Sequence, residues 1–124
     1  MLGGNDLLRG LDPAGMQANL DGILAAISAK RLPVLLAGLP APENYGPAYR
    51  DAFKAAFREV ADEHDAIYVP SFLAGMGQGR SVRQIMALMQ PDGIHPNARG
   101  VDAIVDHIGP KVLELVARAR TGRS

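Results

Sequence analysis

The sequence predicts an α/β domain built on a parallel sheet. Short apolar stretches of strand length alternate with stretches whose apolar residues recur at helical spacing. The run Pro33–Leu39 is apolar throughout, as expected of a parallel strand that is buried on both faces. No internal repeat, low-complexity segment or linker interrupts the 124 residues. We therefore expect one domain spanning residues 1–124.

Composition excludes several classes of function. Lys and Arg total 13, as do Asp and Glu, so no excess of basic residues indicates nucleic-acid binding. No apolar run approaches the roughly 20 residues of a membrane span. Cysteine is absent, which excludes disulfides and thiolate metal sites. The compartment stays unassigned, since an export signal would precede Met1.

The first predicted helix begins at Asp12-Pro13, because aspartate caps a first turn and proline suits the first helical position. Its buried face is predicted to carry Met16, Leu20, Ile23, Leu24 and Ile27. The strand at Pro33–Leu39 follows, and then a proline-stiffened loop at Pro40–Pro47. A second amphipathic helix is predicted to bury Tyr49, Phe53, Phe57, Val60 and Ala61.

A short strand is predicted at Ala66–Val69, followed by a mobile, glycine-rich loop from Pro70 to Arg80. A helical pattern resumes between Ser81 and Met89. Asn97 is placed to cap a long final helix, in which Pro110 predicts a kink or local break. The predicted buried face of that helix consists of Val101, Ile104, Val105, Ile108, Val112, Leu115 and Val116.

The chain starts with Met1-Leu2 and then Gly-Gly-Asn-Asp at residues 3–6, which predicts a tight turn projecting an amide side chain. Such turns are typical of the carboxyl ends of strands, where α/β proteins bind ligands. We therefore expect Met1-Leu2 to be the end of a strand. This stub and the two full strands are fewer than the roughly five of a doubly wound sheet. An incomplete sheet is expected, and a small complete α/β domain is the alternative.

The strongest chemical candidate is the segment Pro91–Asn97. Gly93 allows a sharp turn, which would let the Asp92 carboxylate accept a hydrogen bond from Nδ1 of His95. Nε2 would then face outward, free to take or give a proton, as in the base-and-orienter half of a nucleophilic hydrolase. The structural alternative is a turn in which Asp92 caps and His95 is incidental. The full Asp-Gly-Ile-His-Pro-Asn context, ahead of a capped helix, favours catalysis.

The other candidate motifs and residues are weaker indications of a functional site. Gly75–Gly79 suggests a phosphate loop but lacks a lysine and a direct strand–turn–helix context. His64 follows two acidic residues that point in other directions on a helix, so no metal site is expected there. His107 is predicted to be on the surface or partly packed. No serine occupies the sharp strand-to-helix turn of an activated nucleophile, and the candidates are Ser28, Ser71, Ser81 and Ser124.

Three blocks, Leu2–Asp6, Gly38–Tyr45 and Pro91–Asn97, together resemble the SGNH (GDSL-type) hydrolase superfamily. The resemblance is closest to its bacterial acyl thioesterase, arylesterase and lysophospholipase branch, and it covers nearly the whole chain in the family's order. It implies a flavodoxin-like three-layer α/β/α fold, of which only the carboxyl-terminal strands and helices are expected here. The family's Gly-Asp-Ser block, which bears the nucleophilic serine, and its oxyanion glycine have no counterpart.

The resemblance implies ester or thioester hydrolysis by a Ser-His-Asp mechanism that needs no metal or organic cofactor. By its motifs, His95 matches the general base, Asp92 the third triad member and Asn5 an oxyanion donor. The segment Pro40–Gly46 matches the one that borders the family's acyl pocket. The implied substrate-binding residues are Gly4, Pro42, Asn44 and Tyr45. Because the serine is absent, we expect this chain alone to be inactive.

The implied partner is a small acyl ester or thioester. Two alternatives stay open. In the first alternative, the chain is a non-catalytic module whose exposed strand edge pairs with a second copy of the chain or with an amino-terminal partner. In the second alternative, the chain is a nucleotide-binding protein that uses Gly75–Gly79. The second alternative ranks last.

Overall fold

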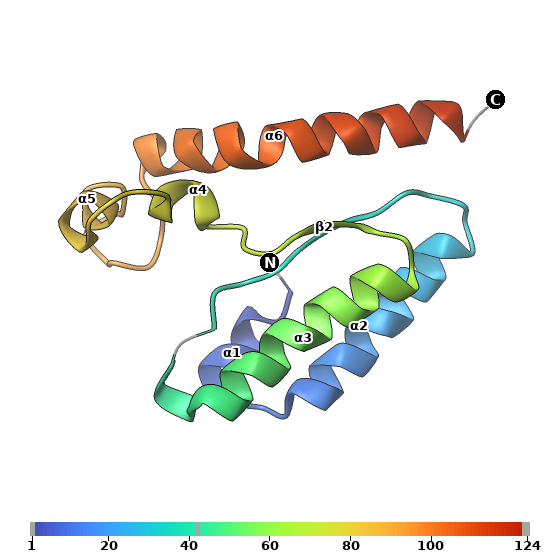
Figure 1. The fold of residues 1–124 in the computed structure, drawn as a ribbon, viewed down its shortest axis with the longest axis horizontal. Helices are drawn as coiled ribbons and strands as arrows, with labels where there is room; N and C mark the ends of the chain where they lie inside the picture. Colours follow the sequence, from blue (N-terminus) through green and yellow to red (C-terminus); the bar gives the residue numbers. More distant parts are fainter. Residues whose placement is uncertain (1, 42, 123–124) are drawn as a thin grey trace.

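The computed structural model describes residues 2–41 and 43–122, which form three layers around a small parallel sheet (Figure 1). Helices α2 and α3 pack together on one side of the sheet, and α6 covers the other. The elements in chain order are α1 (Gly4–Arg9), α2 (Pro13–Ser28), β1 (Leu35–Ala37), the 3-10 turn η1 (Glu43–Tyr45), α3 (Pro47–Glu63), β2 (Ile67–Val69), α4 (Ala74–Gly77), α5 (Val82–Met86) and α6 (Ala98–Thr121). The prediction of an α/β fold with a parallel sheet is confirmed.

Strands β1 and β2 pair in parallel, with Leu36 opposite Tyr68. The Gly38 amide donates to the Val69 carbonyl at 2.9 Å, so even-numbered residues of β1 direct their backbone polar groups toward β2. Those of Leu35 and Ala37 consequently face the opposite edge. No other strand pairs with that edge within residues 2–41 and 43–122.

The strand stub expected at Met1-Leu2 is not observed. Met1 lies outside the described residues, and Leu2 belongs to no strand. Gly3 has a φ of +83° and leads directly into α1, so the chain turns into a helix at this point. The Gly-Gly-Asn-Asp segment is therefore a helix start.

The main hydrophobic core lies between α2, α3 and the sheet. Phe53 and Phe57 of α3 are fully buried and pack among Met16, Leu20 and Leu24 of α2. Ile23 departs from the prediction and is 41% exposed. A second, smaller cluster joins α4, the segment after α5 and α6 through Met76, Leu88 and Ile104.

The predicted buried face of α6 is largely wrong. Ile104 is buried, but Val101, Val105, Val112 and Val116 are exposed. The reason is geometric, because a two-stranded sheet is too narrow to cover the apolar stripe of a 24-residue helix. None of the described helices is long and apolar enough to cross a membrane.

Two local predictions also need correction. Helix α6 continues through Pro110 without a break. Gly109 precedes that proline and has no Cβ to clash with its ring. The expected loop over residues 70–80 contains α4, because Gly75 packs so closely on α6 that an added Cβ would lie 2.2 Å from the Ala103 carbonyl oxygen.

Candidate active site

The Asp92–His95 turn folds as the sequence predicts. Gly93 has a φ of +67°, a conformation that glycine adopts without strain. The turn brings Nδ1 of His95 to 2.7 Å from Oδ2 of Asp92. The His95 side chain is 68% exposed. With Nδ1 engaged by the carboxylate, Nε2 is the ring nitrogen left to exchange protons with a ligand.

Asp92 is held by more than the imidazole. Its Oδ1 accepts hydrogen bonds from the backbone amides of Ile94 and His95, both at 2.9 Å. The His95 amide, the His95 ring and the Ile94 amide, in that order, lower the pKa of Asp92 to about 2. The carboxylate therefore remains ionised throughout the neutral range.

The segment around the turn is anchored to its surroundings. Met89 and Pro96 form an antiparallel bridge, and the Gln90 amide donates to the His95 carbonyl at 2.7 Å. Asn97 caps α6 by accepting a hydrogen bond from the Gly100 amide at 3.1 Å. Its Nδ2 also donates to backbone carbonyls before the turn, those of Ala87 and Met89. Asn97 thus fastens both sides of the turn to the start of α6.

Asn5 lies in the first turn of α1 with an exposed side chain. The start of this helix packs closely on α2, because an added Cβ on Gly3 would lie 2.9 Å from the Met16 sulfur. Its far end is held by Tyr45, whose hydroxyl donates to the Leu8 carbonyl at 3.0 Å. Tyr45 also packs closely against Gly10, where an added Cβ would lie 2.6 Å from Cε1 of the ring.

The structure describes three of the four predicted substrate-binding residues. Gly4 is half-buried next to Leu39, and Asn44 is exposed in η1 beside Tyr45. Pro42 lies outside the described residues. Within those residues, no hydrogen bond links Asn5, Asn44 or Tyr45 to the Asp92–His95 pair. The structure thus presents two groups, one on the Asp-His turn and one around α1 and η1.

No serine among the described residues hydrogen-bonds to His95. Ser28 ends α2, and the Ser81 hydroxyl caps α5 in a reciprocal capping box with Gln84. Ser71 follows β2 and is half-buried. Within residues 2–41 and 43–122, no three His, Asp or Glu side chains gather as metal ligands would.

An apolar cavity of about 390 Å³ lies beside Met89, ahead of the Asp-His turn in the sequence, and was not predicted from the sequence. Met89, which bridges to Pro96, is one of its walls. The other lining residues are Pro40, Ser71, Leu73, Met76, Gly77 and Ile85. Methionines at helical spacing indicate core packing, so the sequence offered only a weak signal for it. The pair formed by His64 and Asp21, with Nε2 and Oδ1 2.6 Å apart, was also missed, because these residues are distant in the sequence.

A family model matches residues 1–103, and it describes the GDSL-like lipase/acylhydrolase family. The chain belongs to this family. Its relatives include the esterase TesA of Pseudomonas aeruginosa, 37% identical over 115 residues, which are 93% of this chain and 54% of that protein. The thioesterase 1/protease 1/lysophospholipase L1 of Escherichia coli K12 is 36% identical over 93% of this chain and 52% of its own length.

Solved structures of GDSL-like hydrolases share the fold. A crystal structure of TesA superposes with a TM-score of 0.75 at 37% identity, over 91% of this chain and 59% of that one. AlinE4, an esterase of the SGNH-hydrolase family, gives a TM-score of 0.63 at 39% identity, over 90% of this chain and 56% of AlinE4. The chain thus spans about half the length of the curated relatives it matches. The predicted family and the incomplete SGNH fold are confirmed.

Proposed function

We propose that this chain carries the proton-transfer half of an SGNH ester or thioester hydrolase, and that a serine from outside residues 1–124 completes the triad. The observation that carries the proposal is the contact of 2.7 Å between His95 and an Asp92 carboxylate whose other oxygen is occupied by two backbone amides. A turn that only led into a helix would not require an ionised carboxylate that is hydrogen-bonded to an exposed imidazole.

In the proposed reaction, Nε2 of His95 takes the proton of the serine hydroxyl as the serine oxygen attacks the acyl carbonyl. Asp92 holds Nδ1 protonated and stabilises the imidazolium. The side-chain amide of Asn5 donates a hydrogen bond to the tetrahedral oxyanion. The imidazolium then protonates the departing alcohol or thiol, and a water molecule repeats the sequence to release the carboxylic acid.

The names of the relatives suggest substrates for this chain: thioesters, lysophospholipids and, from a Vibrio mimicus arylesterase that is 26% identical, aryl esters. The chain covers 54% of that arylesterase. We propose a small acyl ester or thioester for this chain.

A chimera tests the mechanism. The part of P. aeruginosa TesA that precedes its matched region would be fused to residue 1, and p-nitrophenyl butyrate hydrolysis measured. We expect turnover from the chimera and negligible turnover from the chain alone. His95→Ala should remove at least about 10³-fold of the rate, and Asn5→Ala about 10²- to 10³-fold. His107→Ala changes a histidine outside the site and should leave the rate unchanged.

Turnover by the chain alone that disappears in His95→Ala would contradict the requirement for an external serine. A chimera that stays active in His95→Ala would contradict the proposed base. A second measurement needs no nucleophile. The ¹⁵N spectrum of the neutral His95 ring should show the proton on Nδ1 in the wild type and a mixture of tautomers in Asp92→Ala.

A second candidate function is a strand-pairing module, favoured by the free edge of β1. An apolar cavity of about 490 Å³ lies beside that edge, lined by Ile27, Leu32, Pro33, Val34, Leu35, Leu115, Val116 and Ala119. Exposed apolar surface beside an unpaired edge favours addition of another strand. The occupant that we propose is a second copy of this chain. Light scattering at about 100 μM should then show a dimer, whereas a monomer would contradict self-pairing.

A further inference from the structure

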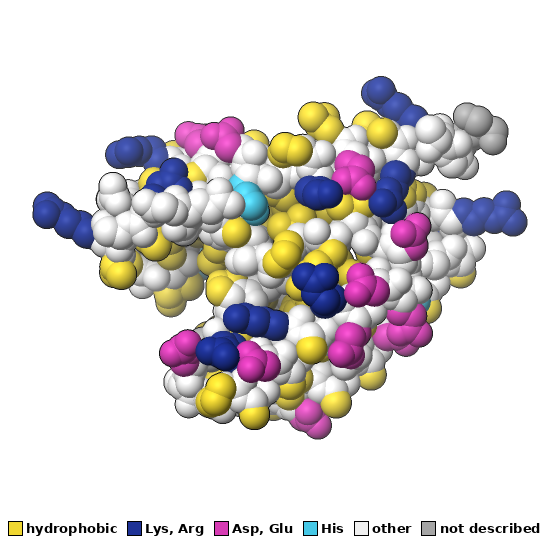
Figure 2. Space-filling view, viewed as in Figure 1, with side chains coloured by type: hydrophobic (Ala, Val, Ile, Leu, Met, Phe, Trp, Pro, Cys, Tyr) yellow, Lys and Arg dark blue, Asp and Glu magenta, His cyan; other side chains and the backbone are white. Residues whose placement is uncertain are grey.

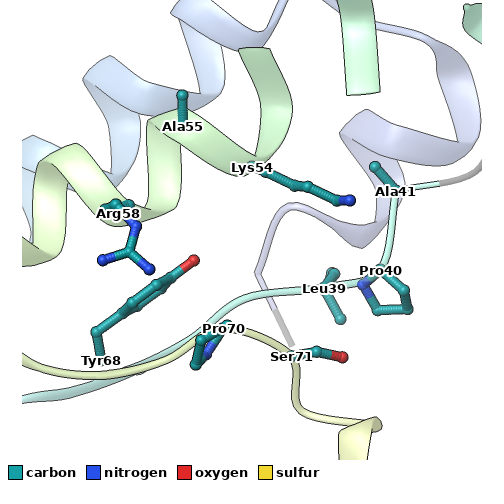
Figure 3. A pocket seen from close by; sticks show the side chains of 9 residues that line it. All are labelled: Leu39, Pro40, Ala41, Lys54, Ala55, Arg58, Tyr68, Pro70 and Ser71. Atoms are coloured by element: carbon teal, nitrogen blue, oxygen red, sulfur yellow. The ribbon is translucent and has the colours of Figure 1, made fainter. Parts of the chain in front are cut away.

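A third cavity, of about 470 Å³, opens between α3 and the carboxyl ends of β1 and β2 (Figure 3). Its apolar lining residues are Leu39, Pro40, Ala41, Ala55 and Pro70. Its polar lining residues are Lys54 and Arg58 on α3, and Tyr68 and Ser71 on the chain that runs through β2 across the cavity from α3. Figure 2 shows a hollow between α3 and α6 in which hydrophobic atoms are visible, with both basic and acidic side chains at its border.

Two positive charges are arranged over this cavity. Lys54 and Arg58 are four residues apart on α3, which places them on one face of the helix. The Arg58 guanidinium lies 5.0 Å from the centre of the Tyr68 ring, and this cation–π contact holds it over the cavity. Neither side chain forms an ion pair or hydrogen bond with any residue of the described ranges 2–41 and 43–122.

Within residues 2–41 and 43–122, neither Asp51 nor Asp62 forms an ion pair with Lys54 or Arg58. Asp51, which is near Lys54, is hydrogen-bonded to Arg50 at 2.9 Å, and this bond lowers the pKa of Asp51. Burial is the largest cause of the raised pKa of the Tyr68 hydroxyl; the Arg58 charge lowers this pKa and the Asp62 charge raises it. The Tyr68 hydroxyl therefore remains a hydrogen-bond donor at neutral pH. The cavity offers two cations and two hydroxyl groups, the second being that of Ser71.

We propose that this cavity binds the phosphate group of an amphiphilic ligand, with Lys54 and Arg58 as its cationic contacts. Phosphate carries up to two negative charges and accepts hydrogen bonds on several oxygens, which suits two cations and two hydroxyls better than a single carboxylate does. The apolar wall beside them accommodates the carbon chain attached to that phosphate. Free phosphate would leave this wall unused.

The position of the cavity connects it with the candidate active site. Pro40 and Ser71 line both this cavity and the apolar cavity beside Met89, and Met89 bridges to Pro96 next to His95. A ligand could therefore place its phosphate near Arg58 and extend its apolar part past Pro40 and Ser71 into the cavity beside Met89. The role of this phosphate site in choosing acyl substrates rests on the proposed hydrolase function, whereas the binding itself does not.

The binding test uses the intact chain and hexyl phosphate, titrated by calorimetry at low ionic strength. Inorganic phosphate, hexanoate and hexanol serve as comparison ligands. We expect hexyl phosphate to bind most tightly, and Lys54→Gln and Arg58→Gln each to weaken it about five- to tenfold. Lys30→Gln removes an exposed charge outside the cavity and should change little. Amide resonances of Ala41, Ala55 and Ser71 should shift on binding.

Equal binding of hexyl phosphate by wild type and by the folded Lys54→Gln/Arg58→Gln double variant would overturn the proposal. So would tighter binding of hexanoate than of hexyl phosphate, or no heat and no resonance shift at millimolar ligand. The titration involves no bond cleavage. A chain that binds hexyl phosphate through Lys54 and Arg58, while the chimera hydrolyses nothing, would support this site and contradict only the hydrolase proposal.

Discussion

Asp92 divides its two carboxylate oxygens between different tasks. Oδ2 contacts Nδ1 of His95 at 2.7 Å, and Oδ1 accepts the backbone amides of Ile94 and His95. The same side chain therefore shapes the turn and orients the ring that the turn carries. A defect in the turn is expected to disturb the imidazole, and protonation of Asp92 is expected to loosen the turn.

The first prediction concerns acid stability. The pKa of Asp92 is about 2 in the folded chain and near 3.8 when unperturbed, so the folded state binds this proton more weakly. The stabilisation by ionised Asp92 is fully present above about pH 4 and is lost as the pH falls through about 2. Urea midpoints of wild type and Asp92→Asn should therefore differ at pH 6 and converge near pH 2.

Asp102→Asn is the control for this titration, because Asp102 is exposed on α6 and makes no hydrogen bond within the described residues. Its urea midpoint should follow that of the wild type at both pH values. A gap between wild type and Asp92→Asn that widens toward pH 2 would contradict the assigned hydrogen bonds.

The second prediction concerns the attachment of α1. Tyr45→Phe removes the hydroxyl that donates to the Leu8 carbonyl, and it should lower the free energy of unfolding by about 0.5–1.5 kcal/mol. Tyr68→Phe removes a hydroxyl that makes no hydrogen bond within residues 2–41 and 43–122, and should change stability less. Chemical denaturation of both variants gives the comparison. A larger loss of stability in Tyr68→Phe than in Tyr45→Phe would show that the hydrogen bond from Tyr45 to Leu8 contributes little to the free energy of unfolding.

The third prediction uses two helical glycines. An added Cβ on Gly100 would lie 2.3 Å from the Leu88 carbonyl oxygen, so Gly100→Ala must displace α6 from the segment before the Asp-His turn. Gly22 has nothing within 4 Å of an added Cβ, and Gly22→Ala should stabilise α2 by up to about 1 kcal/mol. Thermal unfolding should move in opposite directions for the two variants. Movement in the same direction would argue against the packing of α6 described above.

The fourth prediction concerns the core between α2 and α3. Phe53 is 0% exposed, and Phe53→Ala should cost about 3–5 kcal/mol of unfolding free energy. Leu113→Ala, at a side chain that is 70% exposed on α6, should cost well under 1 kcal/mol. Urea unfolding monitored by circular dichroism measures both. Similar losses at the two positions would mean that the core is not where the structure places it.

Local sequence signals predicted the parts of the fold that depend on neighbouring residues. Asp12 accepts a hydrogen bond from the Ala14 amide, and Asn97 caps α6, as capping rules require. Asp92 and His95 are three residues apart, so a single glycine-containing turn was enough to bring them together. The buried face of α3 followed from helical periodicity for the same reason, and Phe53, Phe57, Val60 and Ala61 are buried as predicted.

Local sequence signals did not predict the features that depend on residues distant in the sequence. The exposed stripe of α6 depends on how wide the sheet beneath it is, which helical periodicity does not report. The short helix α4 depends on the close approach of Gly75 to Ala103. The cavity that contains Arg58 and Tyr68 forms only when α3 packs beside β2, so neither residue is notable in the sequence alone.

The one-sided pairing of β1 has a kinetic consequence. The Gly38 amide is tied to Val69, whereas the amides of Leu35 and Ala37 face the unpaired edge. Deuterium from the solvent should therefore enter this strand in an alternating pattern, slowly at Leu36 and Gly38 and quickly at Leu35 and Ala37. A molecule whose backbone pairs with this edge would slow exchange at Leu35 and Ala37 as well, so these amides would report its binding.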